Sequence, residues 1–283
     1  MSITTLAGVA SGLLVPFNYF KTQTVTPVTG TWYSLWTYSG IPGAGTIPSA
    51  IQYTGNFYTS ASALPTGALM FPAPVTGETL YLARFAGNAN TTGTIVLADR
   101  IWADSASPVG TTTMAVFSGS FPRSAGIGAG DSSGTGVMLG AEVYTTMGTG
   151  TPQVRATVIN SQGVGDTLQT WSTIPASAVA GTFMPMYSVI PTNSVTAGKT
   201  SFGIRSVSRW HNSATHTSGV WGLTAFRPII RVCVAVAGVE EAVDALTGGF
   251  PILFPNTVPT LFWISGTTTS ASAMMGNIQY AQG

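Results

Sequence analysis

The stretch Ser201–Val239 carries the longest uninterrupted strand signal in the chain. Branched and aromatic side chains, which pack well on a pleated surface, recur along its length. The pattern predicts a strand, a polar turn over His211–Ser218, a second strand over Gly219–Phe226 and a third over Pro228–Val236. We expect these three strands to form an antiparallel meander at the centre of the core.

Length and charge restrict the kind of protein to which this meander belongs. The chain has 283 residues, which is enough for one large β domain or two smaller ones. Only 7% of the residues are charged and the net charge is +1, whereas about 25% is usual in globular proteins. Because there is no basic field, the sequence predicts no nucleic-acid partner. A surface with so little charge favours self-association.

The rest of the composition is typical of a folded protein with many turns. The 34 Gly and 17 Pro residues are spread through the chain, and apolar residues still make up 45% of it. The single cysteine, Cys233, has no partner for an internal disulfide, and the alternation around it predicts a small core side chain. Disulfides are therefore not expected to hold this fold together.

Further strand signals recur along the chain between turn residues. They are Thr31–Tyr38, Thr79–Ala86, Thr94–Trp102, Thr112–Ser118, Gly136–Tyr144, Pro152–Asn160, Thr182–Ile190, Leu261–Ile264 and Met274–Tyr280. Many strands with short turns predict an all-β fold, an antiparallel β-sandwich or jelly-roll-like arrangement. Apolar residues at helical spacing in Gly238–Leu246 predict one short helix near 239–246.

The N-terminal segment is apolar but does not resemble a secretory signal. Its first basic residue, Lys21, follows the apolar part, and no run in the chain reaches the 18 apolar residues that a membrane span needs. Leu6, Val9 and Leu13 fit one stripe of a short helix that Pro16 would end. We predict an N-terminal docking arm over 1–30 and a β domain over 31–283, either single or made of two subdomains.

The sequence contains few residues suited to catalysis. The only histidines, His211 and His216, lie in one polar turn, so surface-turn side chains are expected; a threefold axis would be needed to assemble an ion site from them. Asp99 stands beside Arg100 and is expected to make a local ion pair or a turn bond. With no recognisable catalytic motif, we predict no enzyme, no catalytic residue, no cofactor and no metal site.

An aromatic cluster early in the chain has two interpretations. Trp32, Tyr33, Trp36 and Tyr38 are close together in sequence, and packing in a core or interface is the commoner role of such residues. The alternative is an exposed platform on which a carbohydrate stacks. No polar cluster accompanies the aromatic residues to bind sugar hydroxyls, which favours packing.

Several phrases of the sequence together resemble a family of virion structural proteins of tailed bacteriophages. They follow the same order as in the family and are Leu35–Pro48, Leu97–Ala106, Phe121–Gly165 and Val243–Ala271. The resemblance implies a virion component, most naturally a decoration or cement protein on the capsid exterior, and it carries no functional residues.

The composition is consistent with that role, because symmetric association multiplies weak contacts. We therefore expect a homo-oligomer, a trimer by preference, whose partners are the major capsid protein or other virion proteins. The expected location is the virion, with the host cytoplasm during assembly. The alternative is a tail or fibre component that binds a host receptor or glycan.

Overall fold

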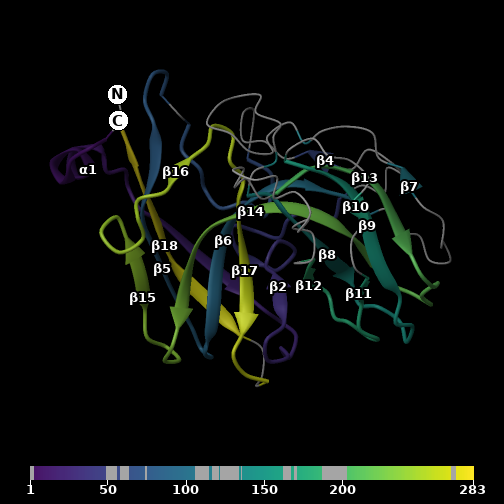
Figure 1. The fold of residues 1–283 in the computed structure, drawn as a ribbon. Coiled ribbons are helices and arrows are strands. Elements are labelled where there is room, and N and C mark those ends of the chain that lie inside the picture. Colours follow the sequence, from purple (N-terminus) through teal and green to yellow (C-terminus); the bar gives the residue numbers. More distant parts are fainter. Residues whose placement is uncertain are drawn as a thin grey trace. The chain divides into compact units, whose positions relative to one another are not determined.

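A computed structural model describes most of the chain, as residues 3–48, 56–57, 64–73, 75–105, 115–116, 121, 134, 136–161, 167–168, 171–186, 203–268 and 272–283 (Figure 1). One helix and a series of strands make up these residues. In chain order they are α1 (Leu6–Gly12), β1 (Phe17–Thr22), β2 (Trp32–Ser34), β3 (Gly40–Ile41), β4 (Asn56–Phe57), β5 (Leu80–Ala89), β6 (Gly93–Ala103), β7 (Ala115–Val116), β8 (Met138–Thr145), β9 (Gln153–Asn160), β10 (Thr167–Leu168), β11 (Ser172–Thr173), β12 (Thr182–Pro185), β13 (Ile204–Asn212), β14 (Val220–Val234), β15 (Glu241–Asp244), β16 (Ile252–Leu253), β17 (Pro259–Ser265) and β18 (Ala273–Gln282). The strands pair antiparallel, so the predicted all-β antiparallel fold is confirmed.

The chain divides into two compact units. Unit 1 comprises Met1–Thr46, Thr59–Asp99 and Ile229–Gly283, and unit 2 comprises Ile47–Tyr58 and Arg100–Pro228. The chain passes from one unit to the other within β6 and again within β14. The sequence-based division, an arm over 1–30 and a domain over 31–283, follows different limits and stays a prediction.

Unit 1 contains one sheet with the order β15-β5-β18-β1-β3, to which β16 adds at β5. In the same unit, β17 pairs with β2 on one side and β6 on the other. Gly87 of β5 lies so close to Ile95 of β6 that a Cβ there would come within 2.7 Å of the Ile95 side chain. The two groups of strands therefore face each other, and Tyr19 stacks on Phe85 with ring centroids 6.0 Å apart. This packing is that of a β-sandwich.

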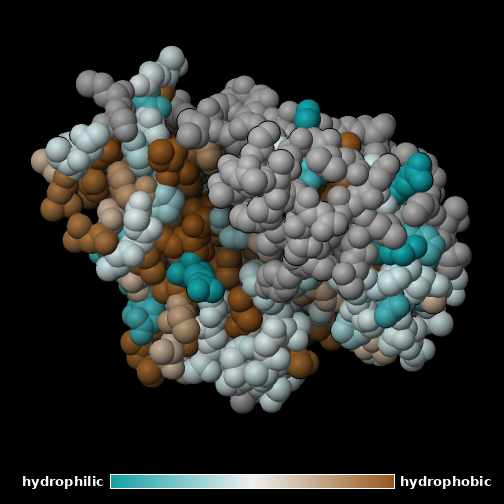
Figure 2. All heavy atoms as spheres, in the orientation of Figure 1, coloured by the Kyte–Doolittle hydropathy of each residue, from teal (hydrophilic) through white to brown (hydrophobic). Residues whose placement is uncertain are grey.

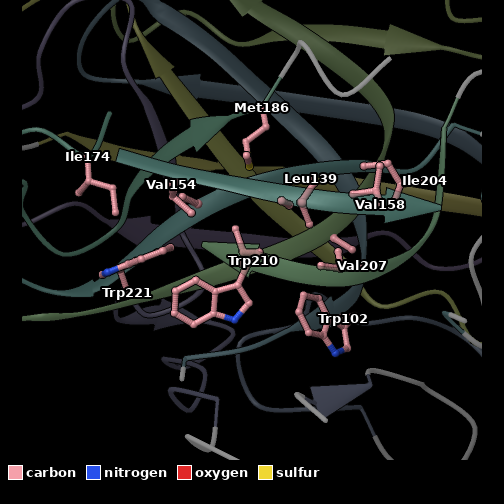
Figure 3. Packing of buried hydrophobic residues seen from close by; sticks show 14 of the residues in the cluster. Trp102, Leu139, Val154, Val158, Ile174, Met186, Ile204, Val207, Trp210 and Trp221 are labelled. Carbon is pink, nitrogen blue, oxygen red and sulfur yellow. The ribbon is translucent and has the colours of Figure 1, made fainter. Parts of the chain in front are cut away.

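Unit 2 has the strand order β10-β9-β13-β7 with β11 beside β9, and separately β8 pairs with β12 and β14. Apolar side chains from both groups fill one core (Figure 3). Within it, Trp210 of β13 meets Trp221 of β14 edge to face, with ring centroids 5.4 Å apart. Val158 and Leu139 contribute to the same core from β9 and β8. A second sandwich results.

The predicted meander over Ser201–Val239 is wrong in two respects. Gly219–Phe226 and Pro228–Val236 do not form two strands, because β14 runs unbroken through Pro228. In addition, β13 pairs with β9 and β7, whereas β14 pairs with β8. Strand signals show that residues are extended, but they do not show which strands pair, since pairing depends on distant residues.

The helix predicted near 239–246 is also wrong. Glu241–Asp244 forms β15, and Val243 lies opposite Phe85 of β5. Asp244 then closes a turn, in which its Oδ1 accepts hydrogen bonds from the backbone N–H groups of Leu246 and Thr247, both at 3.0 Å. A helix this short gains little in isolation, so pairing with an available sheet edge prevails.

The predicted N-terminal helix is present as α1, and Thr5 caps it by accepting a hydrogen bond from the N–H of Gly8 at 3.1 Å. None of its residues is buried. Further along the same segment, β1 lies between β18 and β3 within a sheet. Among the described residues, no helix is long and apolar enough to span a membrane.

Candidate functional site

The two histidines occupy different environments. His211 is the last residue but one of β13, is half-buried and lies beside Trp171, with ring centroids 5.2 Å apart. His216 is buried in the turn that follows, and this burial lowers the pKa of its imidazole. The surface position expected for His216 is therefore wrong. In the described part of the chain, no three His, Cys, Asp or Glu side chains come together as a metal site would require.

The local ion pair expected between Asp99 and Arg100 is wrong. Successive side chains of a strand point to opposite faces, so neighbours in β6 diverge. Asp99 Oδ1 accepts a hydrogen bond from the backbone N–H of Val258 at 2.9 Å. Arg100 Nη2 instead lies 2.8 Å from Glu142 Oε2, and both side chains are buried.

The ion pair between Arg100 and Glu142 belongs to a polar cluster inside unit 2. Glu142 Oε2 also accepts hydrogen bonds from the hydroxyl groups of Tyr144 at 3.1 Å and Thr224 at 2.5 Å. Arg100 Nη2 donates to the Tyr144 hydroxyl at 3.2 Å. One carboxylate oxygen thus accepts several donors out of reach of solvent. This arrangement holds four side chains in one geometry, which is typical of a polar network with a structural role.

Unit 1 buries a cation in another way. Lys21 of β1 is buried, and its Nζ donates to the backbone carbonyls of Tyr38 at 3.0 Å and Gly43 at 3.2 Å. Burial lowers the pKa of the Lys21 amine to about 8. The lysine therefore anchors the segments before and after β3 to β1 through hydrogen bonds to neutral groups.

The aromatic cluster near the N-terminus packs in the core. Tyr33, Trp36 and Tyr38 are buried, and Trp36 Nε1 donates to the carbonyl of Thr46 at 3.0 Å. Trp32 is half-buried, with its ring 6.1 Å from that of Phe262. The expected packing role is confirmed, and the cluster offers no open platform for a sugar.

Cys233 is exposed, so its prediction as a core residue is wrong. The reason is its place in the alternation of β14, where its neighbours Val232 and Val234 are the buried residues. The alternation of side chains shows that the segment is a strand. It does not show which face of the strand is buried, because the opposing sheet decides this.

Exposed apolar side chains gather on unit 1. Of the large apolar side chains that are exposed in the described residues, all but Ile47 belong to this unit. In Figure 2 hydrophobic residues crowd the side of the molecule that carries α1 and β15. The unit 1 residues are Leu6, Leu13, Val15, Phe20, Val28, Ile41, Met70, Val75, Val236, Val239, Leu246, Ile252 and Met275.

A shallow groove of about 220 Å³ lies within this apolar surface. Ile3, Leu6 and Val9 line it from the α1 side, and Leu246 and Phe250 line it from the turn after β15. Leu6 is 65% exposed and Leu246 is 78% exposed, so both side chains are largely open to solvent. The sequence predicted the apolar stripe of α1, whose Leu6 and Val9 line one side of this groove. It did not predict the groove itself, because a helix was expected where the turn after β15 forms the other side.

Comparison with known proteins gives little guidance. No protein-family model matches the chain, and no curated protein matches it. Among solved structures, that of the infectious bursal disease virus Gx strain aligns with 95% of this chain and 68% of its own, at 12% identity and a TM-score of 0.20. The infectious bursal disease virus VP2 subviral particle aligns with 95% of this chain and 81% of its own, at 13% identity and a TM-score of 0.20. Similarity at this level is weak and carries no argument about function.

Proposed function

We propose that this chain is a non-enzymatic structural component of a bacteriophage virion, an oligomeric protein that decorates and stabilises the exterior of the capsid. The resemblance of its sequence phrases to tailed-phage virion proteins supports the proposal. The observation that carries it is the apolar surface of unit 1 around α1, because exposed apolar patches mark sites of association. The partners are the major capsid protein and further copies of this chain.

The geometry of α1 supports a docking role for the first residues. Gly12, at the end of the helix, fits against β18 so closely that a Cβ would come within 2.5 Å of the Gln282 carbonyl oxygen. Leu14 continues the contact, since its N–H donates to the Tyr280 carbonyl at 2.9 Å. The helix is therefore held at its C-terminal end, while Leu6 remains open to solvent. An anchored helix with an exposed apolar side chain is suited to packing on a neighbour.

The low charge of the chain supports the same proposal. With 7% charged residues and a net charge of +1, copies of the protein repel one another only weakly. A specific interface buries about 1,600 Å² in total, and burial of apolar surface contributes about 25 cal/mol per Å². When such contacts are repeated over a symmetric particle, even contacts of modest strength are sufficient for stable association.

The aromatic cluster does not support the alternative function, a tail or fibre component that binds a glycan. That alternative relied on Trp32–Tyr38 as an open aromatic platform, and three of those aromatic side chains are buried. The head is therefore the location that we propose. Separating purified heads from tails and detecting the chain by mass spectrometry tests this: its presence in the head fraction alone is expected, and recovery only with tails would contradict it.

The docking surface is tested by substitution. Leu246→Gln places a polar group in the exposed part of the groove, so the number of copies per purified particle should fall while the melting temperature stays unchanged. Ile47→Gln is the matched control, because Ile47 is an exposed apolar residue of unit 2. Equal occupancy by wild type and Leu246→Gln would show that the groove is not the contact. Light scattering that finds only monomers at high concentration would contradict the homo-oligomer.

A further inference from the structure

The outer face of the β9–β13 pair in unit 2 collects basic side chains. Val154 of β9 lies in the core, so the adjacent Arg155 points to the opposite face. Trp210 of β13 lies in the same core, which leaves Arg209 and His211 on the outer face. His211 is directly opposite Arg155 in the register of the two strands. Residues 50 or more positions apart in sequence therefore become neighbours.

Trp171 fixes Arg155 in place. The guanidinium carbon of Arg155 lies 4.2 Å from the centroid of the Trp171 ring, and the His211 ring lies 5.2 Å from the same ring. Trp171 comes immediately before β11, which pairs with β9. Stacking covers one face of the guanidinium and leaves the N–H groups at its edge, which bind carboxylate and phosphate oxygens in the guanidinium plane.

Among the described residues, no carboxylate forms an ion pair with an arginine of this face. The two ion pairs in the part of the chain that the structure describes use Glu240 and Glu142, and neither includes an arginine of β9 or β13. Arg155, Arg205 and Arg209 all come from these two strands, in a chain with only ten lysines and arginines. The described residues of β9 and β13 thus carry three arginines and no Asp or Glu.

Neutral hydrogen-bonding groups adjoin the basic ones. Gln153 lies two residues before Arg155 and so shares its face of the strand. Its Nε2 donates to Thr173 Oγ1 at 3.3 Å, and both residues are exposed. A half-buried indole, a held guanidinium and exposed amide and hydroxyl groups complement the three features of an acidic sugar, which are its apolar ring face, its carboxylate and its hydroxyl groups.

We propose that this face, built on Arg155, Trp171, Arg209, His211 and Gln153, binds an acidic polysaccharide through its carboxylate groups. Arg155 takes a carboxylate through the edge of its guanidinium, and Arg209 and His211 add positive charge beside it. The sugar rings lie against Trp171 and the amide and hydroxyl groups next to it. This site is separate in sequence from the aromatic cluster Trp32–Tyr38, which is buried.

The test is isothermal titration of the full chain with polygalacturonate at low salt, with neutral dextran and polyglutamate as comparison polymers. Polygalacturonate should bind more tightly than polyglutamate, and dextran should not bind. Arg155→Gln and Trp171→Ala should each weaken polygalacturonate binding by about tenfold or more, because each removes a direct contact. Arg231→Gln is the charge-matched control, since Arg231 is an exposed arginine of unit 1, and it should change affinity by less than about twofold.

Three results would overturn the proposal. One is the absence of polygalacturonate binding, and another is equal weakening by Arg231→Gln and Arg155→Gln, which would indicate attraction by charge alone. The third is equal binding of polyglutamate that Trp171→Ala leaves unchanged, which would assign the face to an acidic peptide. If circular dichroism shows that Arg155→Gln is unfolded, Arg209→Gln takes its place, because Arg209 is exposed and its substitution leaves the core intact.

Discussion

The two units bury a cation by different means. In unit 1, Lys21 donates to two backbone carbonyls and its pKa falls to about 8. In unit 2, Arg100 pairs with the carboxylate of Glu142 at 2.8 Å. A lysine can release its proton when burial disfavours the charge, whereas an arginine stays charged at any ordinary pH. The arginine therefore needs a counter-ion, and the lysine does not.

The surfaces of the units differ as well. Unit 1 exposes most of the large apolar side chains that are open to solvent among the described residues, while unit 2 carries the basic outer face of β9 and β13. An apolar surface favours association with another protein, whereas a charged face favours ligands whose binding weakens as the salt concentration rises. One chain thus has separate regions suited to assembly and to recognition.

The largest expected effect tests whether the interior of unit 1 accepts a charge that has no partner. Val232 and Val234 are both buried, so aspartate at either position should cost about 5 kcal/mol or more and prevent folding. Cys233→Asp is the matched control, because this residue between them is exposed. Soluble yield and urea denaturation measure the difference. Folded protein from Val232→Asp would show that this part of β14 is not core.

The next effect tests the ion pair of unit 2. Glu142→Gln keeps the shape of the side chain but leaves Arg100 charged and buried, so the free energy of unfolding should fall by about 3–5 kcal/mol. Glu240→Gln is the control, since Glu240 pairs with Arg84 at the surface, where the Arg84 side chain is 35% exposed and the Glu240 side chain is 43% exposed. This substitution should lower the free energy of unfolding by less than about 1 kcal/mol. Similar losses in both variants, measured by denaturation with urea, would remove the contrast between the units.

A pH-dependent effect follows from the lowered pKa of Lys21. Unfolded lysine titrates near 10.5 and the folded residue near 8, so between these values the unfolded chain holds more protons and stability rises with pH. From pH 7 to 9.5 the wild type should gain about 2 kcal/mol relative to Lys21→Met. Denaturation curves at several pH values measure this difference. Parallel pH profiles for the two proteins would show that the lysine does not titrate in this range.

The smallest effect on stability is expected from shortening the N-terminus. Deleting Met1–Ser11 removes most of a helix with no buried residue, so the free energy of unfolding should change by about 1 kcal/mol or less while particle occupancy falls.

Deleting Met1–Phe20 is the contrasting, harsher change, because it also removes the buried Tyr19 and most of β1. We expect that longer deletion to unfold unit 1. A stable protein after both deletions would show that β1 is dispensable.

The sequence predicted the positions of the strands better than it predicted which strands pair with one another. Strand patterns located β5, β6, β8, β9, β17 and β18 to within a few residues, because alternation of side chains is a local property. The N-terminal helix was found for a similar reason. The strand Glu241–Asp244 was missed, since its spacing also fits a helix and only the adjacent strand β5 decides between the two.

The candidate sites depended more heavily on tertiary structure. The sequence indicated that Trp32–Tyr38 would pack in a core or an interface and that the N-terminal stripe was unusually apolar, because these features follow from residue type. It could not pair Arg100 with Glu142, nor place His211 opposite Arg155, since each pair joins strands that are distant in sequence. Composition and periodicity determined what the chain forms locally. Hydrogen bonding between strands, whose partners no local pattern specifies, decided which side chains meet and which face each strand buries.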